Sequence, residues 1–111
     1  MIERLPKEFK GKGDVKNYYY SQVYQRKLKN GKYAYIYSQM DISVEEPYIC
    51  GYEVVIPQVS PKVEISSENN HILYKKTDIL SEYYPNSERW GTNGFTFRTL
   101  NEAMKKISSF A

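Results

Sequence analysis

The sequence predicts an α+β fold in which a small antiparallel sheet of three to five strands is packed by one C-terminal helix. Asn30-Gly31 lies between two runs rich in aromatic and β-branched residues, a pattern typical of a tight β-hairpin. Twelve of the 111 residues are Tyr, which favours strands because its flat ring packs well on a pleated surface. Near the C-terminus, Thr99 and Glu102 have the spacing of a capping box that starts a helix.

The hairpin is expected to use a two-residue turn in which Asn30 and Gly31 both have positive φ. Such a turn pairs Leu28 with Tyr33, and the alternation of side chains then assigns every residue to a face. One face would be an open surface rich in tyrosine, and the other would meet the core. The first face carries Gln22, Tyr24, Arg26, Leu28, Tyr33, Tyr35, Tyr37 and Gln39, and the second carries Tyr19, Val23, Ala34, Ile36 and Met40.

Residues 51–59 are expected to form a third strand. Pro57 either ends this strand or marks it as an edge strand, because proline has no N–H to donate to a neighbouring strand. Residues 60–70, rich in Ser, Glu and Asn, are expected to form a loop, and turns are expected to dominate residues 78–94. Between them, residues 71–74 fit either a short strand or one turn of helix.

The ends of the chain differ in character. Residues 1–16 predict a polar lead-in segment, from which Leu5, Phe9 and Val15 could dock on the core. Residues 17–111 predict a single α+β domain. In this domain Phe95-Thr96-Phe97 is expected to be a short strand, and a helix follows whose apolar residues recur at helical spacing on one face. These helix residues are Leu100, Ala103, Met104, Ile107 and Phe110.

Composition bounds the class of protein. The chain is 41% hydrophobic and 26% charged, as in ordinary globular domains. Cys50 is the one cysteine, which excludes an intramolecular disulfide. No apolar stretch has the length of a signal-peptide core or a membrane span. We therefore expect a cytoplasmic protein without a membrane partner, and the sequence does not indicate its oligomeric state.

The net charge of +3 is unevenly distributed. Residues 1–32 carry nine Lys or Arg against three Asp or Glu, whereas residues 33–111 carry seven against ten. A basic first third could favour a polyanionic partner. A solvated surface without a specific partner is the simpler interpretation, because the cationic residues do not cluster densely.

The sequence offers few groups for catalysis. His71 is the one histidine and Cys50 the one cysteine, and neither lies in a signature of a nucleophile and its base. No grouping has the spacing of a zinc site, and Gly11-Lys12-Gly13 is too short for a phosphate-binding loop. We expect a protein that is not an enzyme, with no catalytic residues, no metal ligands and no cofactor.

The hairpin offers a candidate binding surface, which we call the hairpin tyrosine face. Aromatic rings on an open sheet can stack nucleic-acid bases, and an arginine can contact phosphate or a ring. Tyr and Arg are also typical of protein interfaces. A third interpretation is that the face is a second core surface, covered by the helix or by residues 60–94. The candidate residues are Tyr24, Arg26, Tyr33, Tyr35 and Tyr37.

The second half of the chain carries a resemblance. Gly51-Tyr52-Glu53-Val54-Val55 is followed by Tyr84-Pro85, Trp90-Gly91, an aromatic strand and the helix start Thr99-Leu100-Asn101-Glu102-Ala103. This pattern resembles small uncharacterised proteins of bacteriophages and mobile elements, many from Bacteroidetes-like hosts, over residues 51–111. The resemblance implies an accessory protein that binds a host protein, for example a defence component, and carries over no active site. Single-stranded nucleic-acid binding through the hairpin tyrosine face is the alternative function.

Overall fold

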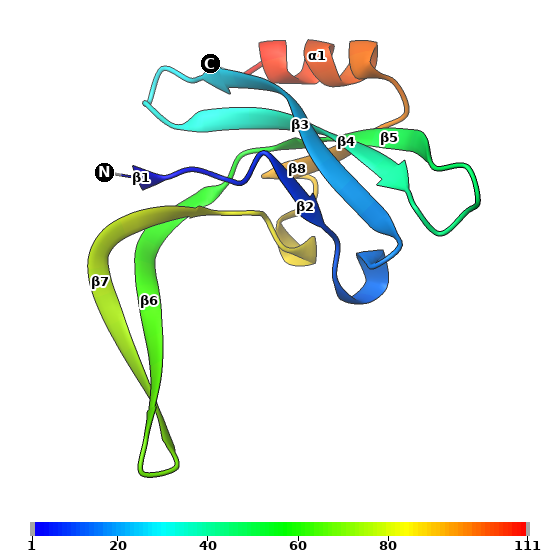
Figure 1. The fold of residues 1–111 in the computed structure, drawn as a ribbon. Coiled ribbons are helices and arrows are strands. Elements are labelled where there is room, and N and C mark those ends of the chain that lie inside the picture. The colour runs from blue at the N-terminus through cyan, green and yellow to red at the C-terminus, as the bar shows by residue number, and fades with distance from the viewer. Residues whose placement is uncertain (1, 111) are drawn as a thin grey trace.

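The computed structural model describes residues 2–110. Met1, the first residue of the predicted lead-in segment, and Ala111, the last residue of the predicted domain, lie outside the described residues. Within residues 2–110 the strands form a five-stranded antiparallel sheet of order β2-β3-β4-β5-β8 and a three-stranded sheet of order β1-β7-β6. Figure 1 shows α1 across one face of the larger sheet and the β6–β7 hairpin extending away from the body. The predicted α+β class is confirmed.

The larger sheet is built from β2 (Glu8–Lys10), β3 (Tyr18–Lys27), β4 (Tyr33–Asp41), β5 (Tyr48–Val55) and β8 (Gly94–Phe97). The smaller sheet is built from β1 (Ile2–Glu3), β6 (Gln58–Glu68) and β7 (His71–Tyr83), in which β1 runs parallel to β7. The helix α1 spans Leu100–Ser108. Short 3₁₀ turns, η1 and η2, occupy Gly13–Val15 and Ser87–Arg89.

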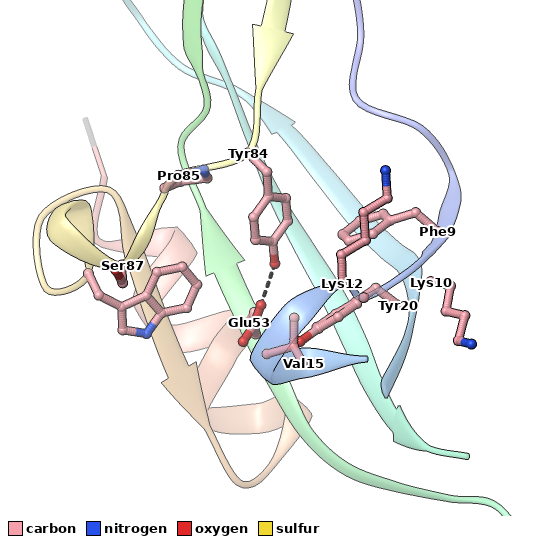
Figure 2. Close-up of a pocket in the computed structure, with 11 residues that line it drawn as sticks. Phe9, Lys10, Lys12, Val15, Tyr20, Glu53, Tyr84, Pro85 and Ser87 are labelled. Carbon is pink, nitrogen blue, oxygen red and sulfur yellow. Dashed lines mark hydrogen bonds between the residues drawn. The ribbon is translucent and has the colours of Figure 1, made fainter. Parts of the chain in front are cut away.

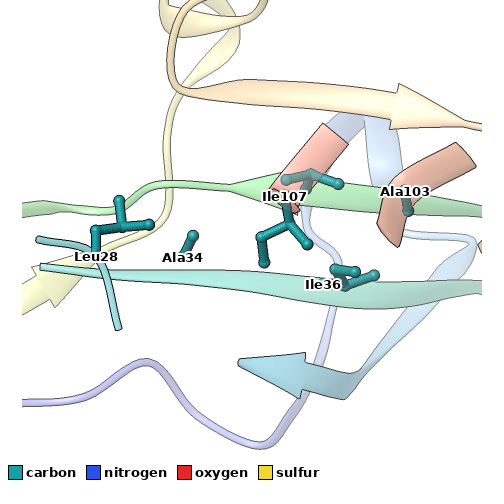
Figure 3. Packing of buried hydrophobic residues seen from close by; sticks show 6 residues of the cluster. Leu28, Ala34, Ile36, Ala103 and Ile107 are labelled. Atoms are coloured by element: carbon teal, nitrogen blue, oxygen red, sulfur yellow. The ribbon is translucent and has the colours of Figure 1, made fainter. Parts of the chain in front are cut away.

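The C-terminal helix forms where the capping box predicts it. The Thr99 hydroxyl accepts a hydrogen bond from the Glu102 N–H (3.2 Å) and donates one to Glu102 Oε1 (3.0 Å). Ala103 and Ile107 are completely buried, whereas Leu100 is 41% exposed, so the buried stripe is narrower than predicted. This stripe packs on the sheet in the core cluster shown in Figure 3, made of Leu28, Ala34, Ile36, Val54, Ala103 and Ile107.

The predicted register of the first hairpin is wrong by one residue. Gly31 has φ +84°, its N–H donates to the Leu28 carbonyl (3.0 Å), and the Leu28 N–H donates to the Lys32 carbonyl (2.8 Å). These bonds describe a three-residue loop, which ends in a left-handed glycine, in place of a two-residue turn. Tyr33 therefore pairs with Lys27, not with Leu28.

The one-residue difference moves side chains to the opposite face of β3. Tyr24 now pairs with Ile36, and Arg26 pairs with Ala34, on the side covered by the helix. A bulge lies between Gln22 and Tyr24. Beyond it, toward the start of β3, the side chains return to the predicted side of the sheet, where Gln22 pairs with Tyr37. Of the five residues predicted to face the core, Ala34 and Ile36 do so completely, whereas Val23 is exposed.

The predicted end of the third strand is confirmed, but the loop predicted after it is wrong. β5 ends at Val55, and Pro57 separates it from β6. Residues 58–83 then form a long hairpin, which turns at Asn69 and Asn70 with φ of 50° and 64°. Asparagine tolerates this left-handed conformation because its side chain can bond its own backbone. The strand alternative for residues 71–74 is confirmed. Turns were predicted to dominate residues 78–94, but residues 78–83 belong to β7, and turns occupy the chain only from Tyr84 to Asn93.

The first residues of the chain are part of the fold. β1 pairs with β7, β2 pairs with β3, and Leu5 between them is buried. Predicted docking of Leu5 and Phe9 is confirmed, because Leu5 belongs to the core cluster on the face opposite α1 and Phe9 packs against it. This second cluster contains Leu5, Tyr20, Tyr35, Tyr37 and Val55, with Phe9, Tyr18, Tyr33, Tyr84 and Trp90 packed against it. Docking of Val15 is wrong, because Val15 is 38% exposed and belongs to neither core cluster.

A buried carboxylate fastens the N-terminal segment to this face. Glu82 on β7 accepts hydrogen bonds at Oε1 from the Leu5 N–H (3.0 Å) and from the Tyr35 hydroxyl (2.5 Å). Its Oε2 accepts from the Arg4 guanidinium at 3.2 Å. The same side chain therefore joins β7, β4 and the segment between β1 and β2.

Replacing Ile107 by alanine should lower the free energy of unfolding by about 2–5 kcal/mol, because it leaves a cavity under α1. Leu100→Ala is the matched control on the exposed flank of the same helix and should change stability by less than about 1 kcal/mol. Urea denaturation of both variants measures the difference. Equal losses in the two variants would place the buried face of the helix elsewhere.

Replacing Glu82 by alanine should lower the free energy of unfolding by on the order of 3 kcal/mol, because two buried donors lose a charged acceptor. Glu3→Ala is the control. Glu3 pairs with Lys62 at 3.1 Å, but both side chains are exposed, so its loss should stay within about 1 kcal/mol. Thermal and urea denaturation compare the two, and a Glu82→Ala protein as stable as Glu3→Ala would contradict the role given to Glu82.

Candidate functional site

A cavity of about 790 Å³ lies between the N-terminal segment and the chain that follows β7, above β3 and β5. Figure 2 shows the side chains around it, with Phe9, Lys12 and Tyr20 on one side and Pro85 and Ser87 on the other. Its volume is within the usual range for small-molecule sites, about 300–1,000 Å³. The lining residues are Phe9, Lys10, Gly11, Lys12, Val15, Tyr20, Glu53, Tyr84, Pro85, Ser87 and Trp90.

Four aromatic rings line the cavity. Phe9 stacks on Tyr20 with ring centroids 4.9 Å apart and meets Tyr84 edge to face at 5.3 Å. Tyr84 in turn lies nearly parallel to Trp90, 6.4 Å away. Because each ring contacts another, the wall is a connected set whose members hold one another in place.

Trp90 is positioned by two further contacts. Its indole N–H donates to the Thr96 hydroxyl at 3.0 Å. Its ring lies on Gly94, where an added Cβ would fall 2.3 Å from the indole. Only glycine leaves room for this approach, so the tryptophan and the glycine four residues later form one structural unit.

Gly11 has a structural role of the same kind at the mouth of the cavity. A Cβ there would lie 2.0 Å from the Val15 carbonyl oxygen, so the chain can close into η1 only with glycine at this position. Lys10 and Lys12 on either side are exposed. Gly11-Lys12-Gly13 is thus the start of a tight turn that leaves two lysines at the rim.

Glu53 supplies a carboxylate to the cavity. It lies within β5 and is 8% exposed, and its Oε1 accepts a hydrogen bond of 2.5 Å from the Tyr84 hydroxyl, drawn in Figure 2. Among the described residues no group donates a hydrogen bond to Glu53 Oε2. Every fully buried polar side-chain atom in this part of the chain has a hydrogen-bond partner, so Oε2, which has none, is not fully buried. Oε2 is therefore open to the cavity.

Burial governs the titration of these groups. It raises the pKa of Glu53, and the hydrogen bond from Tyr84 partly opposes that rise. Burial, together with the Glu53 carboxylate, also raises the pKa of the Tyr84 phenol and brings the pKa of Tyr20 to about 12. The phenols therefore stay neutral donors at physiological pH.

The predicted hairpin tyrosine face is not a single surface. Tyr24 and Arg26 lie on the side of α1, where the Arg26 guanidinium donates to the Ile107 carbonyl at 2.9 Å. Tyr33, Tyr35 and Tyr37 lie on the opposite side. The separation follows from the one-residue register difference, which the Asn-Gly turn alone could not reveal.

Tyr35 and Tyr37 are completely buried and Tyr33 is half-buried, as expected from the interpretation of this face as a second core surface. Residues 82–90 cover it from the predicted 60–94 segment, and the N-terminal segment covers the rest. Tyr37 donates to the Pro6 carbonyl at 2.6 Å and Tyr35 donates to Glu82.

Sequence reasoning missed the residues that do line the cavity. Glu53 carried a signal, because a carboxylate between Tyr52 and Val54 is unusual in a strand with both faces buried. Trp90 together with Gly94 carried a weaker signal. Phe9 and Tyr84 had none, because their meeting depends on contacts between distant parts of the chain.

A second surface of note is the distal part of the β6–β7 hairpin, residues 61–80, which we call the arm. Pairing of Ile65 with Tyr74, and of Ser67 with Ile72, places apolar side chains on one face. Ile65, Ile72 and Tyr74 are 70%, 63% and 69% exposed. The other face is mainly polar, with Glu64 opposite Lys75 and Glu68 opposite His71, although Leu73 lies there opposite Ser66. The arm is therefore amphipathic, and its apolar face is open.

Replacing Tyr84 by phenylalanine should lower stability by about 1–3 kcal/mol at pH 7, because the buried carboxylate of Glu53 loses its donor. The loss should be smaller at pH 4. Burial raises the pKa of Glu53 in the folded protein above its value in the unfolded chain. The contribution of Glu53 to stability is therefore full below the unfolded-state pKa and is lost as the pH rises through the folded-state pKa. Removing the Tyr84 hydroxyl raises that pKa further and deepens the loss toward neutral pH.

Urea denaturation between pH 4 and pH 8 measures this dependence. Tyr19→Phe is the control, because Tyr19 also donates to a carboxylate, Glu8 Oε2 at 2.9 Å, but on the exposed surface. Its effect should be small at every pH. An equal loss for Tyr84→Phe at pH 4 and pH 7 would contradict the coupling to Glu53.

Within residues 2–110, no group of three or more His, Cys, Asp or Glu is arranged to hold a metal ion. No helix in that range has the length and apolar character needed to span a membrane. Comparisons of the chain with protein-family models, with curated proteins and with solved structures gave no match.

Proposed function

We propose that the chain is a non-catalytic accessory protein that acts by binding another protein through the arm. The observation that supports this is the open apolar face of Ile65, Ile72 and Tyr74. A two-stranded hairpin on its own is barely stable in water, and contiguous exposed apolar surface is typical of interaction sites. A partner that covers this face would stabilise the arm.

The free edge of β6 favours one kind of partner. Among the described residues β6 pairs with β7 alone, so its outer N–H and C=O groups are open to another strand. Strand addition uses these groups for affinity and the alternating side chains for specificity. Glu64 and Glu68 stand on the polar face of β6. The proposed partner is therefore an extended segment in which apolar residues alternate with Lys or Arg.

The charge of the arm favours a protein over a polyanion at this surface. Binding to nucleic acid depends on an excess of cationic residues. The arm has none, because its three lysines are balanced by three acidic residues. These residues are Lys62, Lys75 and Lys76, and Glu64, Glu68 and Asp78.

The resemblance to phage and mobile-element proteins fits this role, since such an accessory protein acts by occupying a host protein and needs no active site. We place the role in the cytoplasm, where the thiol of Cys50 would stay reduced. A component of a host defence is the kind of target that the resemblance implies.

A fluorescently labelled peptide of alternating valine and lysine is the probe for this proposal. It should bind the full chain, and nuclear magnetic resonance shifts should fall on the β6 amides. Ile65→Asp should weaken binding about tenfold or more by placing a charge on the apolar face. Val44→Asp is the control, because Val44 is also an exposed β-branched residue, at 41%, but lies outside the arm. Both variants should keep the melting temperature of the wild type.

Two controls separate the alternatives. A peptide of alternating valine and glutamate should bind more weakly than the lysine peptide, and Glu64→Lys should reverse that order. Failure of the lysine peptide to bind, or equal binding by Ile65→Asp, would overturn the proposal. So would sedimentation showing a wild-type dimer that Ile65→Asp dissociates, because a second copy would then occupy the arm.

A further inference from the structure

The cavity bounded by Phe9, Tyr20, Tyr84 and Trp90 has no part in binding through the arm. We propose that it binds the base of a nucleotide that carries an exocyclic amino group, with the phosphate near Lys10 and Lys12. Neither the proposed partner nor the arm is needed for this site.

The aromatic walls suit a flat ring. Phe9 and Tyr20 stack at an interplanar angle of 17°, and Tyr84 and Trp90 at 27°. Rings so arranged offer their faces or edges to a base, and stacking of this kind accepts any base because every base has a π-face. The walls therefore account for affinity but not for the choice of base.

The choice comes from Glu53. An ionised carboxylate is an acceptor only, and Oε1 is already occupied by the Tyr84 hydroxyl. Oε2 is open to the cavity, on a side chain that is more than nine-tenths buried. An exocyclic amine would donate to it, as cytosine does to acidic side chains in nucleic-acid complexes. A carbonyl oxygen in the same place would be repelled.

The rim favours an anion over an organic cation. Lys10 and Lys12 are exposed and form no ion pair within residues 2–110, where the ion pairs join Arg4 to Glu82 and Lys62 to Glu3. A carboxylate in an aromatic box could also attract a methylated ammonium group. That ligand would pass two lysines at the entrance, whereas a nucleotide would meet them with its phosphate.

This chemistry has two sources, a free nucleotide and an unpaired base in a single strand. The first assay titrates the full chain with AMP, IMP, CMP and UMP and follows the emission of Trp90, the single tryptophan of the chain. AMP and CMP should bind roughly tenfold more tightly than IMP and UMP, which have a carbonyl oxygen in place of the amine. Glu53→Gln should remove that discrimination, because an amide both donates and accepts.

A second pair of variants tests the phosphate contact without altering the buried carboxylate. Lys10→Ala with Lys12→Ala should weaken AMP about tenfold and leave adenosine unchanged, since only the nucleotide carries the charge. Lys16→Ala is the control, a lysine nearby that does not line the cavity. Ile65→Asp should leave nucleotide binding unchanged, so failure at the arm and failure at the cavity are separable.

A short oligodeoxyadenylate distinguishes the sources. Displacement of the oligonucleotide by AMP at similar concentration identifies a free nucleotide as the ligand. Much tighter, steeply salt-dependent oligonucleotide binding identifies a single strand. The proposal is overturned if AMP at millimolar concentration leaves Trp90 emission unchanged, if AMP and IMP bind equally, or if tetramethylammonium binds in preference to AMP.

Discussion

The carboxylate of Glu82 joins three parts of the chain that are far apart in the sequence. It receives the Tyr35 hydroxyl from the larger sheet, the Leu5 N–H from the N-terminal segment and the guanidinium of Arg4. Because Glu82 is itself on β7, this one side chain fixes the base of the arm. Two residues later Tyr84 reaches Glu53, so the cavity and the arm depend on the same anchor.

The abundance of tyrosine has its explanation in this second core. The face of the sheet opposite α1 is covered by irregular chain, which cannot supply a regular apolar layer. Tyrosine fills the volume while its hydroxyl satisfies polar groups of the covering segments, as Tyr37 does for the Pro6 carbonyl and Tyr35 for Glu82. Burial raises the pKa of both phenols, so they remain protonated donors. The tyrosines thus fasten two layers together.

Elements governed by local chemistry could be predicted from the sequence, and those governed by distant contacts could not. The helix follows from Thr99 and its neighbours, and the end of β5 follows from Pro57. An Asn-Gly pair fits both a two-residue and a three-residue loop, which is why the register and the hairpin tyrosine face were wrong. Residues 60–70 are rich in Ser, Glu and Asn, which indicated a loop and concealed the alternation of side chains along β6. The cavity could not be predicted from the sequence, because Phe9, Glu53 and Tyr84 come together only in the folded chain.

The separation along the chain between Leu5 and Glu82 has a consequence for the order of assembly. Hairpins such as β3–β4 join near neighbours, and closing short loops loses little entropy. The Leu5–Glu82 contact spans 77 residues, and contacts of such long range form slowly. The Arg26–Ile107 contact that holds α1 on the other face spans 81 residues, so both faces of the larger sheet are closed by contacts of long range. During synthesis the β3–β4 hairpin is therefore complete before either face is covered: the cavity face waits for β7 and Trp90, and the other face waits for α1.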